Sequence, residues 1–271
     1  MEKQKVKILV ACHKPDSVYE DDVYTPIHVG RAISKCTDKM HDMIGDDTGE
    51  NISKKNPMYC ELTAQYWAWK NLNNVEYVGL CHYRRYFETQ VTNDNIDKLL
   101  GIHYDVILAV PLIEHGCMGV RLQKATCMED VYILMHVLKK VSPDFYLTAK
   151  RFLNGNICIP YNMFVMRKNL FDRFACWQFF ILEEMEKHIR LSGYTRMRRI
   201  YGYMAEMLLP IWCEHNKLHI RYDYIVPMLG EKTIKSWKTP LRDMRNNFVF
   251  FLRREKLNLE VDSVRVGLKK R

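Results

Sequence analysis

The chain has 271 residues, of which 48% are hydrophobic and 27% are charged, so a packed fold is expected and intrinsic disorder is excluded. The formal net charge of +9 points to anionic ligands or surfaces. The nine cysteines include no Cys-x-x-Cys pair and no zinc-finger spacing. This pattern excludes a disulfide framework and a structural zinc, and it favours free thiols in a reducing cytosol.

The pattern of apolar residues predicts strands that alternate with helices. Strands or extended segments are expected at residues 5–11, 77–81, 105–110, 157–166 and 219–226. Helices are expected at residues 56–71, 127–141, 169–191 and 198–217, the first with Asn56 as its N-cap and Pro57 in its first turn. The alternation predicts an α/β fold with a mostly parallel sheet flanked by helices.

The two ends of the chain carry their own information. The first strand begins too early to leave room for a signal peptide, and the longest apolar run, residues 106–113, is too short to cross a bilayer. The most economical organisation is one domain, residues 1–230, followed by a basic extension, residues 231–271. This extension holds twelve basic and five acidic residues, a net charge of +7.

The extension also contains the apolar run Phe248–Leu252, which arginines flank on both sides. Such a segment is typical of an interfacial helix that lies in the headgroup region of an anionic membrane. The alternative is a terminal helix that packs its apolar side on the body of the protein. The sequence leaves both open.

The segment after the second predicted strand is the most informative in the chain. An apolar run, residues 77–81, leads directly into His82-Tyr83-Arg84-Arg85. Ligands of α/β folds bind at the carboxyl ends of strands, and guanidinium groups match phosphate oxygens in pairs. The segment therefore predicts a phosphate-binding site. The glycine-rich dinucleotide and P-loop fingerprints, the Gly-x-Ser-x-Gly elbow and the His-Glu-x-x-His motif are all absent.

Several long motifs occur together in a distinctive order. They are His13-Lys14-Pro15, Pro26-Ile27-His28-Val29-Gly30, the loop from Gly45 to Ser53, the segment from Asn56 to Asn71, and the segment from Val78 to Phe87. Over residues 6–225 the chain thereby resembles a family classed as a domain of unknown function. Its members occur in bacterial capsule and exopolysaccharide loci and are taken to be glycosyltransferases, some of them associated with galactofuranose transfer.

This resemblance implies a GT-A-like fold that binds a nucleotide-diphosphate sugar. It implies that the donor contacts Ala11 and His13 in the loop after the first strand. His82-Tyr83-Arg84-Arg85 stands where such folds usually carry a metal-binding Asp-x-Asp. The implied donor site therefore has no metal and uses the two guanidiniums instead. Asp46, Asp47 and Asn51 are further donor-binding candidates, and the two aspartates are the alternative metal ligands.

An inverting transferase needs a carboxylate that deprotonates the acceptor hydroxyl. Glu206, in an otherwise apolar helical stretch, is the first candidate, with Asp46, Asp47 and Glu61 in reserve. A surface Glu206 paired with Arg198 or Arg199 is the alternative. Asn162 is expected to face the sugar or to cap buried backbone.

Together these features predict a glycosyltransferase on the cytoplasmic face of the plasma membrane. It would move a hexose, plausibly galactofuranose, from a uridine diphosphate donor to a lipid-linked oligosaccharide. The rival hypotheses are a retaining transferase that uses another nucleotide sugar and a non-enzymatic nucleic-acid-binding protein. No nucleic-acid partner is expected, because only the basic extension supports the second rival and no nucleic-acid-binding motif is present.

Overall fold

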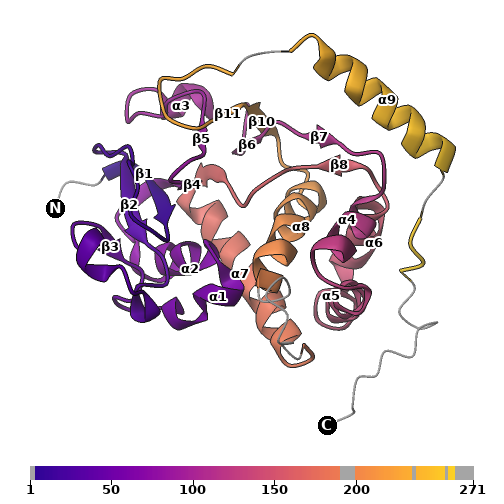
Figure 1. Ribbon diagram of the computed structural model, residues 1–271, viewed down its shortest axis with the longest axis horizontal. Coiled ribbons are helices and arrows are strands. Elements are labelled where there is room, and N and C mark those ends of the chain that lie inside the picture. The colour runs from indigo at the N-terminus through magenta and orange to yellow at the C-terminus, as the bar shows by residue number, and fades with distance from the viewer. Residues whose placement is uncertain (1–3, 190–198, 234–235, 254–255, 260–271) are drawn as a thin grey trace. The chain divides into compact units, whose positions relative to one another are not determined.

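The computed structural model describes residues 4–189, 199–233, 236–253 and 256–259 (Figure 1). Its contacts divide the chain into two units, each drawn from three separate stretches. Unit 1 comprises Met1–Val110, Pro160–Cys176 and Leu218–Ile234, and unit 2 comprises Pro111–Ile159, Trp177–Lys217 and Lys235–Arg271. The expected division into one domain and an extension from residue 231 stays a prediction. Residues 234–235, 254–255 and 260–271 of that extension lie outside the described residues.

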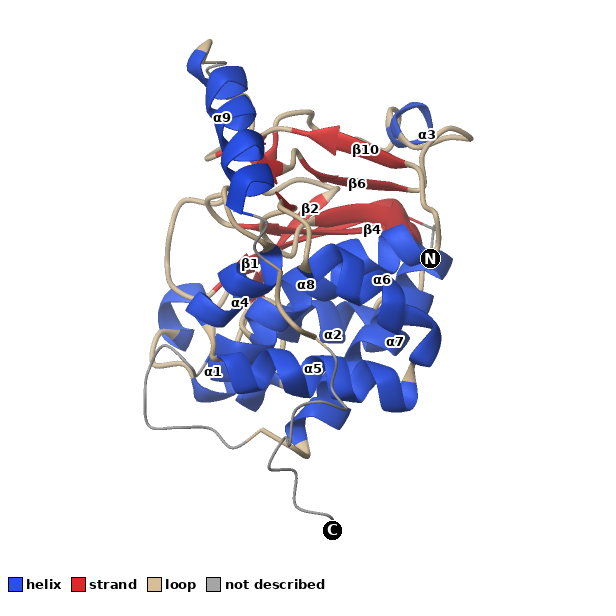
Figure 2. Ribbon diagram, turned by 90° about the vertical axis from the view of Figure 1, so that its right-hand side faces the viewer, coloured by secondary structure: helices blue, strands red, loops and turns tan. Residues whose placement is uncertain are grey.

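Unit 1 is built on a seven-stranded sheet with the order β10-β6-β9-β4-β1-β2-β3. The strands are β1 (Gln4–Cys12), β2 (Tyr24–His28), β3 (Ile44–Gly45), β4 (Val75–His82), β6 (Val106–Ala109), β9 (Phe164–Arg167) and β10 (Ile220–Asp223). All neighbouring pairs are parallel except the two that β9 makes, with β4 and with β6. The predicted α/β class with a mostly parallel sheet is confirmed. Figure 2 shows β6 and β10 side by side.

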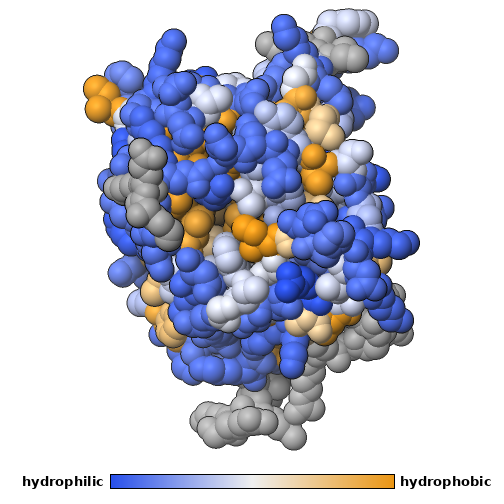
Figure 3. Space-filling view, turned by 90° about the vertical axis from the view of Figure 1, so that its left-hand side faces the viewer, coloured by the Kyte–Doolittle hydropathy of each residue, from blue (hydrophilic) through white to orange (hydrophobic). Residues whose placement is uncertain are grey.

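Strand β1 is continuously apolar and buried from Ile8 to Cys12, which is typical of a strand whose two faces are both covered. Val6, Ile8 and Val10 enter one buried cluster, which also contains Tyr77 of β4. On the sheet, Phe164 of β9 stacks on Phe171 of α7 (Lys168–Glu186) with ring centroids 5.5 Å apart. The face of the molecule drawn in Figure 3 is mainly hydrophilic, with smaller groups of hydrophobic side chains near its middle.

Short elements complete unit 1. They are the 3-10 helices η1 (Arg31–Ile33), η2 (Thr37–Met40) and η3 (Ser53–Lys55), the helices α1 (Asn56–Tyr59), α2 (Leu62–Asn71) and α3 (Ile96–Leu99), and the antiparallel pair β5 (Tyr86–Phe87) and β11 (Ile225–Val226).

The helix expected over residues 56–71 is interrupted, which corrects the sequence prediction. Cys60 adopts φ 54° and ψ −131°, a conformation that L-residues rarely take, and it separates α1 from α2. Asn56 is the first residue of α1 rather than its N-cap, and its Nδ2 donates to the Cys60 carbonyl at 2.8 Å. The side chain thereby stabilises the break. Pro57 lies in the first turn as expected.

Unit 2 is mainly helical. Its elements are α4 (Met118–Ala125), α5 (Met128–Val141), α6 (Pro143–Leu153), the part of α7 from Trp177 onward, α8 (Ile200–His215), α9 (Lys238–Arg253) and the two-stranded ribbon of β7 (Leu112–Ile113) and β8 (Ile157–Cys158). Phe145 of α6 stacks between His215 and Trp177, at centroid distances of 3.8 and 4.5 Å. These rings join α6, α7 and α8 into one packed group.

All nine cysteines are free thiols, as the sequence predicts. Burial raises the pKa of the Cys81 thiol to about 12, so it stays protonated at neutral pH. Among the described helices, none combines the length and hydropathy that a bilayer crossing requires.

Candidate functional site

The carboxyl ends of four parallel strands meet at one edge of the unit 1 sheet. Ala11 of β1 pairs with His82 of β4, Cys12 with His28 of β2, and His28 in turn with Gly45 of β3. The antiparallel β9 starts at the same edge, because Phe164 pairs with Leu80. The expected donor-binding residues all lie at these strand ends or in the segments that follow them. Asn162 precedes β9 and joins them.

The segment His82–Arg85 forms a tight turn that is fixed to β1. The amide of Arg85 donates to the carbonyl of His82 at 2.9 Å, and the amide of His82 donates to the carbonyl of Arg85 at 3.2 Å. The amide of Tyr83 donates to the carbonyl of Ala11 at 3.3 Å. Ala11 thus contributes through its backbone. The turn holds two exposed guanidiniums at the ligand-binding edge of the sheet.

Aromatic rings support the cationic side chains of this turn. The Arg85 guanidinium lies 4.3 Å from the centroid of Tyr161, and that of Arg84 lies 5.3 Å from the centroid of Tyr83. Tyr83 in turn meets the ring of His13 edge-on at 5.3 Å. Stacking on a ring restricts a guanidinium without using its hydrogen-bond donors. The cluster therefore presents donors in a largely preset arrangement.

Arg84 also has a carboxylate partner. Its Nε and one terminal nitrogen lie 2.8 and 2.6 Å from the same oxygen of Asp16, in the loop after β1. A phosphate that approaches Arg84 therefore competes with Asp16 or binds the remaining donors. The described contact of Arg85 is with the ring of Tyr161, which leaves its hydrogen-bond donors available. Arg85 is therefore the stronger candidate for binding a phosphate.

Asp46 follows β3 and is fully buried. One carboxylate oxygen accepts from the Gly30 amide at 2.7 Å. The other accepts from the Arg31 amide at 3.1 Å and from the Ser53 hydroxyl. These bonds fix the turn after β2 to the loop after β3. The carboxylate is thus occupied by the protein's own donors, which is a structural use of Asp46.

Asp47 and Asn51 lie in the same loop. Asp47 Oδ1 is 3.0 Å from Nε of Arg31. The Asn51 side chain donates to the carbonyls of Asp47 and Gly49 at 3.0 and 2.9 Å and thereby closes the loop. Across the described residues, no group of three or more His, Cys, Asp or Glu side chains has metal-binding geometry. The observed bonds of Asp46 fit poorly with a role as a metal ligand.

For the sugar transfer that the resemblance implies, we expect turnover to survive removal of divalent cations, because Arg84 and Arg85 stand where such folds usually carry the metal-binding aspartates. The measurement is sugar transfer in excess chelator compared with transfer in added manganese. Loss of all turnover in chelator, with recovery in manganese, would contradict the expectation and make Asp47 a ligand candidate. Metal independence stays a prediction until then.

A buried pair of side chains lies beside the basic turn. Asn162 Nδ2 donates to Oε1 of Glu61 at 2.6 Å, and both residues are buried. Each follows a non-glycine residue with positive φ: Cys60 at 54° and Tyr161 at 67°. Backbone conformations of this kind cost about 1–3 kcal/mol each and are concentrated at functional sites. Asn162 thus meets the reserve carboxylate Glu61, which belongs to the same unit as the donor residues.

His28, at the end of β2, is fully buried. Within the described part of the chain, neither of its ring nitrogens has a hydrogen-bond partner. Burial lowers the pKa of His28, and Arg31 acts in the same direction, while Asp46 and Asp47 oppose them. The neutral imidazole is therefore the folded form.

Because the folded pKa lies below the unfolded value of about 6.5, protonation favours the unfolded chain. The contribution of His28 to stability is complete above that pH and is lost as the pH falls below it. We expect urea midpoints to fall between neutral and mildly acidic pH, and to fall less in His28→Phe. The exposed His103→Asn serves as the control. Equal pH dependence in His28→Phe and the wild type would refute the assignment.

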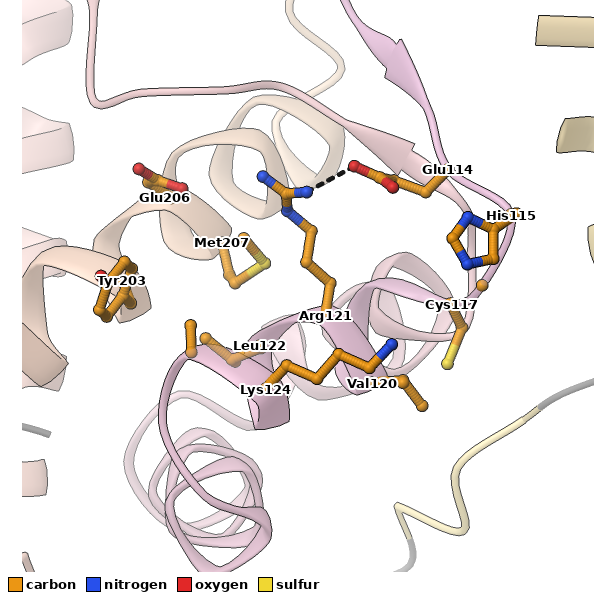
Figure 4. A pocket seen from close by; sticks show the side chains of 12 residues that line it. Glu114, His115, Cys117, Val120, Arg121, Leu122, Lys124, Tyr203, Glu206 and Met207 are labelled. Carbon is orange, nitrogen blue, oxygen red and sulfur yellow. Dashed lines mark hydrogen bonds and ion pairs between the residues drawn. The ribbon is translucent and has the colours of Figure 1, made fainter. Parts of the chain in front are cut away.

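Glu206 lies on α8 in unit 2, where it lines a pocket of about 510 Å³ (Figure 4). Glu114 and Arg121 lie across the pocket, with a nitrogen–oxygen distance of 2.5 Å between them. Apolar side chains, among them Met207 and Leu122, line the same space. Glu206 is half-buried, and the pocket that it lines is also lined by the carboxylate of Glu114 and the guanidinium of Arg121. Of its expected surface partners, Arg198 lies outside the described residues.

Two residues of the site escaped the sequence prediction. Asp16 binds Arg84 from 68 positions away, and nothing in the sequence marks that pairing. The ring of Tyr161 stacks on the Arg85 guanidinium. The only sequence feature that could have pointed to Tyr161 is its position directly before Asn162.

The comparisons with known proteins agree with this architecture. Residues 7–217 match the model of a domain of unknown function, DUF4422. The chain belongs to this family. No curated protein matches the chain.

One solved structure shares the fold of this DUF4422 chain. It is the apo structure of the WbbM bifunctional glycosyltransferase, which matches with a TM-score of 0.71 and 27% sequence identity. The match covers 85% of this chain and 46% of the WbbM chain, so this chain spans about half the length of that protein. The predicted α/β architecture and the resemblance to a glycosyltransferase-related family of unknown function are thereby confirmed. The link to capsule or exopolysaccharide loci stays a prediction.

Proposed function

We propose that this DUF4422 protein is a glycosyltransferase that uses a nucleotide-diphosphate sugar. The observation that carries the proposal is the pair Arg84 and Arg85 on a fixed turn at the carboxyl edge of the sheet. The fold shared with WbbM supports the reaction class. In such a reaction the bond between the anomeric carbon and a diphosphate oxygen breaks and the diphosphate leaves. The acceptor oxygen forms a new bond to that carbon, and a base accepts the proton of the acceptor hydroxyl.

The basic turn suits the leaving group of this reaction. Negative charge grows on the diphosphate as the glycosidic bond lengthens, and donors that are already oriented stabilise it without reorganisation. Stacking on Tyr161 and Tyr83 gives the two guanidiniums that orientation. His13 meets Tyr83 and is the proposed contact for the nucleoside, next to the Ala11 backbone.

The finer proposal names the substrates. The donor is a uridine diphosphate hexose, plausibly galactofuranose, and the acceptor is a lipid-linked oligosaccharide in capsular or exopolysaccharide synthesis. Transfer inverts the anomeric centre with Glu206 as the base, and the enzyme works at the inner face of the plasma membrane. A retaining transfer from another nucleotide sugar is the second candidate. Its support is that the buried Glu61–Asn162 pair offers a carboxylate beside the donor residues.

A ligand screen by thermal unfolding tests the reaction class. A ligand that binds only the folded protein, at a concentration of about 100 times its Kd, raises the free energy of unfolding by roughly 2.7 kcal/mol. We expect uridine diphosphate to raise the melting temperature by several degrees. A single-stranded oligonucleotide of equal charge is the control and should leave it unchanged. A melting temperature that rises with the oligonucleotide but not with uridine diphosphate would contradict the proposal.

A further inference from the structure

Helix α9 is attached to unit 2 through Asn246 and Asn247, and Val249 and Phe250 of the same helix are half-buried. Asn246 is buried, and its Nδ2 donates to the carbonyl of Ile113 in β7 at 2.7 Å. Asn247 Oδ1 accepts from Nδ2 of Asn156, next to β8, at 2.8 Å. Side-chain amides that pair with a backbone carbonyl and with another amide hold the helix in one rotation about its axis. The amide-bearing side therefore faces the ribbon of β7 and β8.

The apolar side of α9 is consequently exposed. Six large apolar side chains recur at helical spacing and are each 55–74% exposed: Trp237, Leu241, Met244, Phe248, Phe251 and Leu252. An amphipathic helix normally buries this side against its own protein. In Figures 1 and 2 no other described helix of unit 2 lies along α9. The expected alternative, a terminal helix that packs its apolar stripe on the body, fits the half-buried Val249 and Phe250 but not these six exposed side chains.

Charge identifies the occupant of this surface. Residues 237–253 carry four basic side chains and one acidic one: Lys238, Arg242, Arg245 and Arg253 against Asp243. A second copy of α9 would bring the same positive charge to the interface. An anionic bilayer supplies the opposite charge together with an apolar layer, and Trp237 at the helix start suits the headgroup level.

The attachment of α9 is bonded to a residue that lines the Glu206 pocket. Asn156 Nδ2, which donates to Asn247, also donates to the carbonyl of Glu114 at 3.0 Å. The amide of Glu114 donates back to the carbonyl of Asn156 at 2.9 Å. Glu114 lines the pocket and pairs with Arg121. One asparagine therefore joins the exposed helix to the pocket.

We propose that α9 docks unit 2 on an anionic bilayer with its apolar stripe in the headgroup region, and that the Glu206 pocket takes the polar head of a membrane-anchored acceptor. The proposal rests on the proposed transferase function for the identity of the acceptor. The link between α9 and the pocket is Asn156.

The first test is sedimentation of the full-length protein with vesicles. We expect binding to phosphatidylcholine vesicles that contain about 30% phosphatidylglycerol, and release at high salt. The triple variant Phe248→Ser, Phe251→Ser, Leu252→Ser should bind about tenfold more weakly or worse. Leu147→Ser removes a comparably exposed apolar side chain from α6 and should bind normally. Unchanged melting temperature and uridine diphosphate binding in the triple variant show that the fold and the donor site are intact.

The second test follows the link to the pocket by hydrogen exchange. Vesicles should protect α9 and residues 112–117 in the wild type, whereas Asn247→Ala should keep the protection of α9 and lose that of the ribbon. Equal vesicle binding by the triple variant and the wild type overturns the proposal. So does a wild-type dimer that the triple variant converts to monomer without any vesicle binding. Failure to bind uridine diphosphate, with vesicle binding intact, would overturn only the transferase function.

Discussion

Glu206→Gln should lower turnover by about two to four orders of magnitude while leaving the affinity for the donor unchanged. Glutamine preserves the size of the side chain and its place on α8 but cannot accept the proton of an acceptor hydroxyl. The half-buried position beside the Glu114–Arg121 pair supports this role. The measurement is single-turnover transfer at saturating donor, together with donor titration.

A matched comparison distinguishes Glu206 from the other carboxylates. Glu183→Gln changes an exposed glutamate on α7 and should have no effect on turnover. Glu61→Gln keeps an oxygen that accepts from Asn162, so it removes the charge without breaking the buried pair. If Glu61→Gln abolishes transfer and Glu206→Gln does not, the base is Glu61 and the role assigned to Glu206 is wrong.

Arg85→Ala should weaken donor binding by about 1–3 kcal/mol, the usual cost of a lost charge-assisted hydrogen bond. Arg85→Lys should restore binding only in part, because an ammonium lacks the planar fork and stacks less well on Tyr161. Arg84→Ala should have a smaller effect, since Asp16 already engages that guanidinium. Calorimetric titration of uridine diphosphate into each variant gives the differences.

The chain contains a suitable control for the arginine variants. Arg167 stacks on Tyr77 at 5.0 Å, much as Arg85 stacks on Tyr161, but it lies at the other end of β9. Arg167→Ala should therefore leave donor binding unchanged. Wild-type affinity in both Arg84→Ala and Arg85→Ala would remove the basic turn from the donor site. Equal losses in Arg85→Ala and Arg167→Ala would indicate a general effect on the sheet.

The strands were predictable where the chain is buried on both sides. The apolar runs of β1, β4 and β6 are recognisable in the sequence as buried strands. Because the strands of such a sheet are mostly parallel, the polar residues that follow them are expected at one edge of the sheet. The break at Cys60 was not predictable. Local preference favours a continuous helix there. The Asn56 side chain that bonds to the Cys60 carbonyl also suits a helix N-cap, and Glu61 next to the break bonds to Asn162, 101 positions away.

The candidate site shows the same limit. The basic turn was predictable because its residues are adjacent in the sequence, but the contacts of its side chains come from distant loops. The apolar run between arginines predicted an interfacial or a terminal helix here without deciding which side faces the protein. That choice depends on Asn246 and Asn247 finding partners near β7 and β8, which no local pattern reveals.

The interleaving of the two units has a consequence for synthesis on the ribosome. Strand β10 pairs with β6, yet Asp223 is made more than a hundred residues after Ala109. At a synthesis rate of about 5–20 residues per second, β6 is made on the order of ten seconds before the strand that pairs with this edge. During that interval an unpaired strand edge is open to other chains, since exposed edges template aggregation. Nascent chains stalled before residue 220 should therefore be the ones that chaperones retain.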